Sequence, residues 1–302
     1  MNNKIPSVSI IIPAYNSGKY IGKALRSVIE QTYTNWEAVI INNYSDDNTV
    51  AVCNSFNEPR FKLINFRNNG VIAASRNEGI RLSTGEYIAF LDSDDWWYPE
   101  KLTAAIKHLN NADITFHDLD IYTVHGKCLL KRMKGRKLSF PVFVDLLIRG
   151  NALHNSSVVL KKTILEQIGG LREDPSLISV EDYDLWLRIA QITERFVYIS
   201  ESLGGYWVGT GNLSGASKTR IQRLDAICHQ YIGVLNDTDK KSAEALKDYM
   251  VGRLSQKLGD RKEAINRYWK AMVSPRIALK VKSLILIIIL SLNLIGISRN
   301  EQ

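Results

Sequence analysis

The chain has 302 residues, of which 45% are apolar, 23% are charged and 9% are aromatic. A chain of this length can bury a sizeable core in one large or two small domains, and its apolar content excludes a disordered chain. The three cysteines lie far apart without a CxxC pair, which excludes a disulfide framework and a thiolate zinc site and fits a reducing compartment.

The net charge of +8 comes from one end of the chain. Residues 1–214 contain 23 basic and 23 acidic side chains, whereas residues 215–302 contain 16 basic and 8 acidic ones. A neutral body with a basic end argues against wrapping around nucleic acid and favours contact of that end with an anionic surface such as phospholipid. A solvated, lysine-rich helical face explains the charge equally well.

Strand and helix signals alternate over the first hundred residues. Short β-branched runs predict buried parallel strands at 8–12, 37–41, 61–65 and 87–91. The pattern also predicts a helix after the first strand, capped by Ser17, and further helices over 71–83 and 99–110. This alternation indicates an α/β, doubly wound domain, whose ligands bind beyond the carboxyl ends of the strands.

The rest of the chain is mixed up to residue 214 and reads as helical from residue 218 onward. A further helix is expected near 181–191, and a basic run over 131–137 is read as a solvated loop or as a contact with a diphosphate or a bilayer. At the N-terminus, the apolar run before Pro13 is too short for a signal peptide.

One apolar segment lies near the C-terminus. Ser283 to Ile297 form 15 residues without a charge, between Lys282 and Arg299. A membrane-spanning helix needs roughly 20 apolar residues, so the segment predicts a helix lying in the membrane interface, with a buried core helix as the alternative.

Three carboxylates directly follow the fourth predicted strand. Asp92, Asp94 and Asp95 lie within four residues and repel one another unless a cation lies among them. A hard divalent ion, Mg²⁺ or Mn²⁺, suits these oxygen ligands and usually keeps phosphate oxygens among its ligands. A solvated acidic turn before the next helix is the alternative.

Polar side chains from other loops are expected at the same edge of the sheet. Tyr15 follows the first strand, Asn43 follows the second, and Arg76 lies near the start of the 71–83 helix. An aromatic ring and amide groups can hold a nucleobase there, and Arg76 can reach a phosphate.

These motifs resemble the family 2 glycosyltransferases, which have the GT-A fold. The resemblance covers residues 6–214 and rests on VSIIIPAYN, NNYSDDNT, SVEDYDLWLRIA and above all ASRNEGIRLSTGEYIAFLDSDDWWYPEKL at 74–102. It implies a GT-A domain over 1–214, a Rossmann-like sheet with flanking helices. Residues 215–302 would then form a basic helical extension ending in the membrane-associating helix.

The resemblance also implies roles for individual residues. They are the following: Pro13, Ala14, Tyr15 and Asn43 in the base pocket, Arg76 near the nucleotide, Asp92 and Ser93 near the ribose, Asp92 and Asp94 at the Mn²⁺ or Mg²⁺ ion, and Asp182 as catalytic base. Acids at the start of a helix can also do no more than complement its dipole. A positioned carboxylate is nevertheless what an attacking sugar hydroxyl needs, because the hydroxyl must lose its proton.

Three positions depart from the family pattern. Asn42 and Asn43 stand where aspartates are usual, which leaves UDP as the expected nucleotide and weakly disfavours GDP, whose guanine prefers a carboxylate. Gly209 stands where many relatives have a histidine, so a third protein ligand for the metal is missing and weaker metal affinity is expected.

The sequence therefore predicts an inverting glycosyltransferase of the cytoplasm, bound peripherally to the inner face of the cell membrane. Its donor would be a UDP-sugar and its acceptor a saccharide on a lipid diphosphate, in polysaccharide or O-antigen assembly, with no role for nucleic acid. A single short apolar segment cannot form a polymer channel, which argues against a processive synthase.

Two other functions compete with this prediction. A sugar nucleotidyltransferase would need a glycine-rich basic loop after the first strand, which the sequence PAYNSG is not. A non-catalytic scaffold that binds nucleotide sugars is suggested by Asn42, Asn43 and Gly209, but the presence of Asp92, Asp94 and Asp182 argues against it.

Overall fold

The computed structural model describes residues 7–209 and 215–299, with side chains described up to residue 292. The chain divides into two compact units, residues 1–139 with 152–212 and residues 140–151 with 213–302. Residues 140–151 thus lie with the C-terminal helices, whereas the sequence analysis assigned them to the first expected domain.

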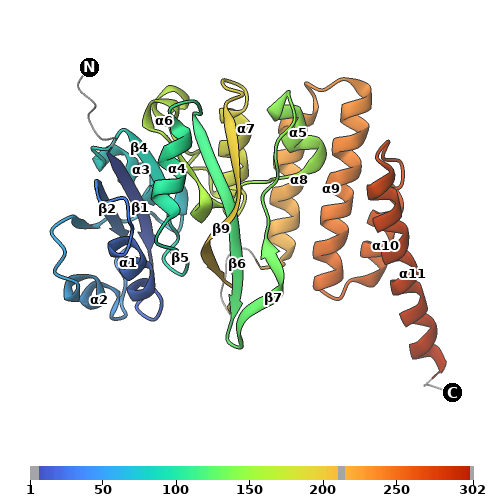
Figure 1. The fold of residues 1–302 in the computed structure, drawn as a ribbon. Coiled ribbons are helices and arrows are strands. Elements are labelled where there is room, and N and C mark those ends of the chain that lie inside the picture. Colours follow the sequence, from blue (N-terminus) through green and yellow to red (C-terminus); the bar gives the residue numbers. More distant parts are fainter. Residues whose placement is uncertain (1–6, 210–214, 300–302) are drawn as a thin grey trace. The chain divides into compact units, whose positions relative to one another are not determined.

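The first four strands form the predicted parallel half of a sheet. They run in the order β3–β2–β1–β4, of which β2, β1 and β4 are labelled in Figure 1. Their bounds are β1 (Val8–Ala14), β2 (Trp36–Asn42), β3 (Phe61–Asn65) and β4 (Tyr87–Phe90). Every residue of β1 and β4 is buried, as expected for strands covered on both faces. Since β2, β1 and β4 are neighbours and parallel, the loops that follow them meet at one edge.

The remaining strands make the sheet a mixed one. β8 pairs antiparallel with β4 and β6, β9 runs parallel to β6, and β5 and β7 pair antiparallel with β9 and β6. Within the described residues the sheet has nine strands. The bounds are β5 (Trp96–Trp97), β6 (Ile114–Thr123), β7 (Gly126–Met133), β8 (Val159–Lys161) and β9 (Phe196–Trp207).

Helices of the first unit lie between these strands along the chain. They are α1 (Ile21–Ile29), α2 (Thr49–Ser55), α3 (Ile72–Leu82), α4 (Lys101–Leu109), α6 (Lys162–Ile168) and α7 (Glu181–Ile189), with short 3₁₀ turns at Asn155–Ser157 and Pro175–Leu177. The helices expected over 71–83, 99–110 and 181–191 are confirmed as α3, α4 and α7.

The predicted cap of α1 is wrong. The helix begins at Ile21, and the Ser17 side chain does not cap it. Instead, the Ser17 carbonyl accepts the N–H groups of Tyr20 and Ile21 at 2.8 and 2.9 Å. The Ser17 hydroxyl lies 2.8 Å from the hydroxyl of Ser93. It is therefore used to join the loop after β1 to the loop after β4 rather than to start a helix.

The second unit is helical throughout its described part. Its helices are α5 (Val142–Arg149), α8 (Lys218–Ile232), α9 (Asp237–Lys257), α10 (Arg261–Ala271) and α11 (Ile277–Arg299). Ala264 and Tyr268 of α10 pack against Ile287 and Leu290 of α11. Among the residues that the structure describes, no helix is both long enough and apolar enough to cross a membrane.

Candidate active site

The loop after β4 is anchored by its last aspartate. Asp95 is buried, and its two carboxylate oxygens accept hydrogen bonds from the Ser156 hydroxyl at 2.6 Å and the Trp207 N–H at 2.9 Å. Burial, followed by the charges of Asp94 and Asp92, raises the pKa of Asp95 well above its usual range. Asp95 therefore fixes the turn.

Asp92 is held from both sides. Its Oδ1 accepts hydrogen bonds from the Arg76 guanidinium at 2.8 Å and from the Asn155 amide at 3.0 Å. Its backbone N–H donates to the Ser156 hydroxyl at 3.1 Å. Ser156 thus accepts from Asp92 and donates to Asp95, so one hydroxyl fixes both ends of the acidic turn.

Arg76 connects this turn to the start of α7. Its guanidinium is 3% exposed and donates to Glu181 Oε1 at 2.7 Å as well as to Asp92. Burial alone would lower the pKa of Arg76, but the charges of Asp92 and Glu181 outweigh it and raise the pKa. A buried cation flanked by two carboxylates is stable only with such geometry, since an unpaired charge at this depth is costly. Arg76 therefore has a structural role in addition to the nucleotide contact that the sequence predicts.

Asp182 follows Glu181 at the first turn of α7. Its carboxylate accepts the N–H of Tyr183 at 2.7 Å. Burial, and then the charge of Glu181, raises the pKa of Asp182 to about 7, although Arg76 acts in the opposite direction. The charge of Asp92 also acts on Asp182. The fold therefore brings the predicted base close to the acidic turn, with a pKa suited to accepting a proton near neutral pH.

The predicted metal ligands fit a hard divalent cation. Burial, and then the charge of Asp92, raises the pKa of Asp94 to about 6. A cation with oxygen ligands would relieve this repulsion. Over residues 7–209 and 215–292, no group of three or more acidic, histidine or cysteine side chains is arranged to hold a metal. Asp92 and Asp94 would therefore need ligands from the substrate.

Replacing Gly209 with a histidine would not by itself restore the third metal ligand that many relatives have. A Cβ at this position would lie 2.4 Å from the indole Nε1 of Trp207. Any side chain at 209 thus requires Trp207 to move.

Three buried polar atoms around Asp92 have no hydrogen-bond partner within the described part of the chain. They are Arg76 Nε, Asn155 Oδ1 and Glu181 Oε2. Buried polar atoms are nearly always paired, so these three atoms are the ones a ligand or a water molecule would be expected to satisfy.

The nucleotide side of the site is more open. Tyr15 is 58% exposed at the end of β1, directly after the buried Pro13 and Ala14. The backbone N–H of Asn43 donates to the Ala14 carbonyl at 2.9 Å, and its side-chain oxygen accepts the N–H of Asn68 at 3.0 Å. One lone pair of that oxygen is left for a base, and the predicted role of Asn43 stays a prediction.

Asn42 has a different environment from Asn43. It is buried, and its amide donates to Asn65 Oδ1 at 2.7 Å while its oxygen accepts the Ser45 hydroxyl at 2.6 Å. An aspartate could not make the first of these bonds. The departure from the family pattern at 42 is thus explained by a contact between the ends of the neighbouring strands β2 and β3.

Sequence reasoning missed the supporting residues. Ser156 was not singled out, Asn155 carries no recognisable motif, and Glu181 was considered only for its effect on the helix dipole. Each acts across a long stretch of sequence: Ser156 follows Asp92 by 64 residues and Glu181 follows Arg76 by 105. Only the acidic pair Glu181-Asp182 offered a signal.

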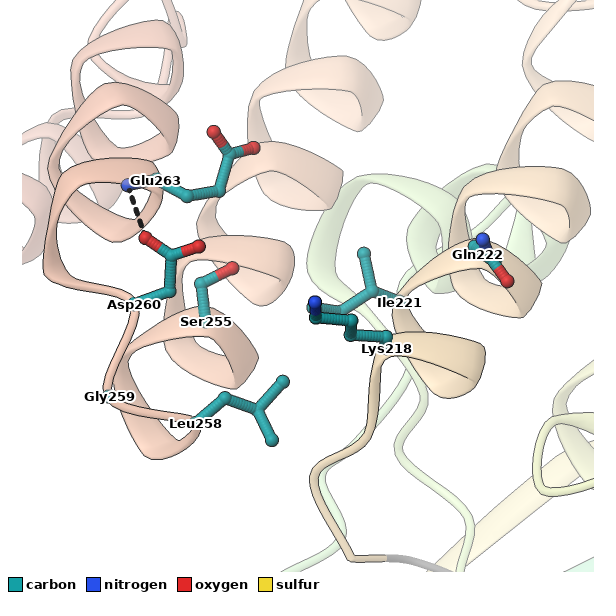
Figure 2. A pocket seen from close by; sticks show the side chains of 8 residues that line it. All are labelled: Lys218, Ile221, Gln222, Ser255, Leu258, Gly259, Asp260 and Glu263. Atoms are coloured by element: carbon teal, nitrogen blue, oxygen red, sulfur yellow. Dashed lines mark hydrogen bonds between the residues drawn. The ribbon is translucent and has the colours of Figure 1, made fainter.

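A pocket of about 550 Å³ lies in the second unit and contains none of the predicted site residues. Figure 2 shows its lining residues from α8, α9 and α10, with Asp260 accepting the N–H of Glu263 at 3.1 Å as the cap of α10. Its acidic groups therefore have a structural role.

Comparisons with known proteins agree with the sequence motifs. Residues 9–150 match the family model for glycosyl transferase family 2. The chain is 31% identical over 183 residues to WfgD of Escherichia coli, a UDP-Glc:alpha-D-GlcNAc-diphosphoundecaprenol beta-1,3-glucosyltransferase, covering 60% of this chain and 69% of WfgD. It spans only 62% and 61% of the length of two other glycosyltransferases that it matches at 31% and 30% identity.

Solved structures show the same fold. Residues 1–349 of TarS from S. aureus, in complex with UDP-GlcNAc, align with a TM-score of 0.65 at 19% identity, over 89% of this chain and 82% of that one. The mannosyltransferase PcManGT from Pyrobaculum calidifontis, in complex with GDP-Man and Mn²⁺, aligns with a TM-score of 0.60 at 18% identity, over 92% and 79%. The GT-A fold predicted from the sequence is confirmed.

Proposed function

The chain belongs to glycosyl transferase family 2, and we propose that it transfers a sugar from a UDP-sugar to a saccharide acceptor on a lipid diphosphate, with inversion at the anomeric carbon. The observation that carries the proposal is the Arg76 bridge, which joins the acidic turn to the helix that begins with Glu181 and Asp182. Donor and acceptor follow the relative WfgD, whose name states a UDP-sugar and a diphosphoundecaprenol-linked sugar. The setting is polysaccharide biosynthesis.

Asp182 acts as the general base. Its carboxylate takes the proton of the acceptor hydroxyl while that oxygen attacks the anomeric carbon from the side opposite the nucleotide. The bond from the anomeric carbon to the diphosphate oxygen breaks in the same step, so an α-linked donor gives a β-glycoside. A pKa of about 7 lets Asp182 be ionised before the attack and hold the proton afterwards.

The remaining residues position the donor. Asp94 and Asp92 would hold Mn²⁺ or Mg²⁺, and that ion would supply positive charge to the departing diphosphate. Arg76 donates to Asp92 and fixes the direction of its carboxylate. The nucleobase would bind on the side of the site formed by Pro13, Ala14, Tyr15 and Asn43. Ser93 is linked to the loop after β1 by the hydrogen bond between its hydroxyl and that of Ser17.

A membrane surface at the C-terminus completes the proposal. Leu279, Ile287 and Leu290 of α11 are buried, whereas the opposite face of the helix exposes large apolar side chains. Those exposed residues are Ile277, Val281, Leu284, Ile285, Ile288, Ile289 and Leu292. An apolar face beside Lys280 and Lys282 suits an interface with anionic lipid, where a lipid-linked acceptor would be met at the inner face of the cell membrane.

The experiment that tests this function is a donor panel with the full chain. UDP- and GDP-sugars are incubated with Mn²⁺ and an α-GlcNAc diphospholipid acceptor, and the product's anomeric configuration is read by NMR. We expect turnover with a UDP-sugar and a β-linked product. Release of pyrophosphate with a sugar 1-phosphate would identify a nucleotidyltransferase. Binding of nucleotide without turnover on any donor or acceptor would favour a scaffold.

A further inference from the structure

The hairpin formed by β6 and β7 carries an irregular bulge. Asp120 of β6 lies opposite Arg132, but Tyr122 lies opposite Lys127, so residues 128–131 of β7 have only Ile121 across from them. Among the strands of the described residues, β7 pairs with β6 alone, so no described strand pairs with its other side. In Figure 1 the turn of the hairpin extends past the ends of the neighbouring strands.

The bulge presents apolar side chains to solvent. Leu129 and Leu130 are 86% and 95% exposed, and Val124 in the turn is 76% exposed. Two neighbouring leucines in a strand would normally point to opposite faces with one of them covered. Here the bulge leaves both uncovered, and surface apolar groups gathered in this way mark an interaction site.

The same segment is strongly basic. Residues 121–139 contain six lysines and arginines and no acidic residue, while the surrounding 1–214 is neutral overall. Asp120 at the base of the hairpin pairs with Lys127 and Arg132 at 2.5 and 2.8 Å, which neutralises one unit of charge and holds the two strands together. The positive charge of the segment is thus concentrated around exposed leucines.

Charge decides which partner fits this surface. A second copy of the chain, paired along the open side of β7, would bring the same cations against each other, because a two-fold contact joins identical patches. A bilayer offers phosphates for the cations and hydrocarbon for the leucines. We propose that the β6–β7 hairpin inserts Leu129 and Leu130 into an anionic lipid surface, as a membrane contact independent of α11 and of the donor chemistry.

The test measures vesicle binding with α11 disabled. The full chain carries Ile285→Glu and Ile288→Glu, both on the exposed face of α11. In that background, Leu129→Ser with Leu130→Ser is compared with Ile192→Ser, an exposed residue of the same unit that lies outside the hairpin. Co-sedimentation uses phosphatidylcholine vesicles with and without phosphatidylglycerol and without any acceptor. Melting curves and donor hydrolysis in vesicle-free buffer check that each variant is folded.

The background chain, which carries only Ile285→Glu and Ile288→Glu, should bind vesicles that contain phosphatidylglycerol and bind pure phosphatidylcholine vesicles much less. Leu129→Ser with Leu130→Ser should weaken binding to phosphatidylglycerol vesicles by about tenfold or more, since most of the apolar area of the hairpin would no longer leave water. Ile192→Ser should leave binding unchanged. Lys131→Gln with Lys134→Gln should weaken binding and reduce its salt dependence.

Other results would overturn the proposal. They are equal binding by the leucine pair and the background chain, no binding of the background chain to anionic vesicles, or binding only when the lipid diphosphate acceptor is added. A fall in molar mass of the leucine variant with vesicle binding intact would assign the surface to a second copy. None of these outcomes depends on whether sugar transfer is observed.

Discussion

The two sides of the candidate active site are built differently. On the chemical side, Arg76 is buried between Asp92 and Glu181, and the three come from segments far apart in the chain. On the nucleotide side, Tyr15 is mostly exposed and Asn43 has one lone pair of its amide oxygen engaged by a neighbouring loop.

This difference separates two tasks. The catalytic base and the acidic turn must be held in fixed geometry, because small displacements of reacting groups cost large factors in rate. The surface that binds the nucleobase can be completed when the nucleotide arrives. Changes on the chemical side should therefore reduce turnover, and changes on the nucleotide side should alter the KM for the donor.

The largest effect is expected from Arg76→Met. It leaves two carboxylates without their shared cation, so we expect a loss of about 3–5 kcal/mol in the free energy of unfolding and turnover near background. Arg81→Met is the matched control on α3, because Arg81 has an exposed side chain and pairs with Glu78 one turn away on the same helix. It should change stability by less than about 1 kcal/mol. Similar urea midpoints and turnover rates for the two variants would contradict the claim that Arg76 stabilises the site between Asp92 and Glu181.

The pH profile should show the base directly. Asp182 acts in its ionised form, and its pKa is raised to about 7, so activity should fall as the pH drops below that value. The fall should approach about tenfold per pH unit in kcat/KM. A profile that is flat well below neutrality would mean that Asp182 titrates elsewhere or does not act as the base.

A smaller effect is expected from Ser156→Ala. The variant removes the hydroxyl that joins the Asp92 backbone to the Asp95 carboxylate, and we expect about a tenfold loss of turnover and about 1–2 kcal/mol of stability. Ser157→Ala is the control, since the Ser157 hydroxyl donates to the His154 carbonyl at 2.6 Å. Equal losses of turnover in both variants would assign Ser156 a purely structural role. The Mn²⁺ concentration for half-maximal rate should rise only in Ser156→Ala.

The smallest effect is expected at Asn43. Asn43→Asp keeps an acceptor for the Asn68 N–H and adds charge toward the uracil N3–H, so the KM for a UDP-sugar should fall about two- to fivefold with kcat unchanged. Asn42→Asp should instead destabilise the fold, because it removes the donor to Asn65. An unchanged KM for the UDP-sugar in Asn43→Asp would mean that the uracil does not contact this residue.

The sequence was most informative where structure is local. The runs at 8–12, 37–41, 61–65 and 87–91 became β1 to β4, because β-branched residues between turn signals indicate strands without help from distant contacts. The predicted burial was wrong for β3, which lies at the edge of the sheet and has no buried residue. The shared edge for Tyr15, Asn43 and Asp92 followed from the parallel order of those strands. The GT-A fold followed from the motif at 74–102.

Long-range contacts were beyond such reasoning. Ser17 looks like a helix cap, but its hydroxyl is taken by Ser93, 76 residues later. Residues 140–151 have no composition that separates them from their neighbours, yet α5 packs with the C-terminal helices. Ser156 lacks any motif because its function depends on where the chain returns to the acidic turn.

The central claim is that Asp182 removes the acceptor proton beside the acidic turn. Asp182→Asn tests it most directly, because the amide keeps the size of the side chain and cannot serve as the base. We predict that this variant binds the UDP-sugar with unchanged affinity while its turnover falls by about 10²–10⁴-fold. Turnover within a few-fold of the wild-type rate, with donor affinity intact, would contradict the account.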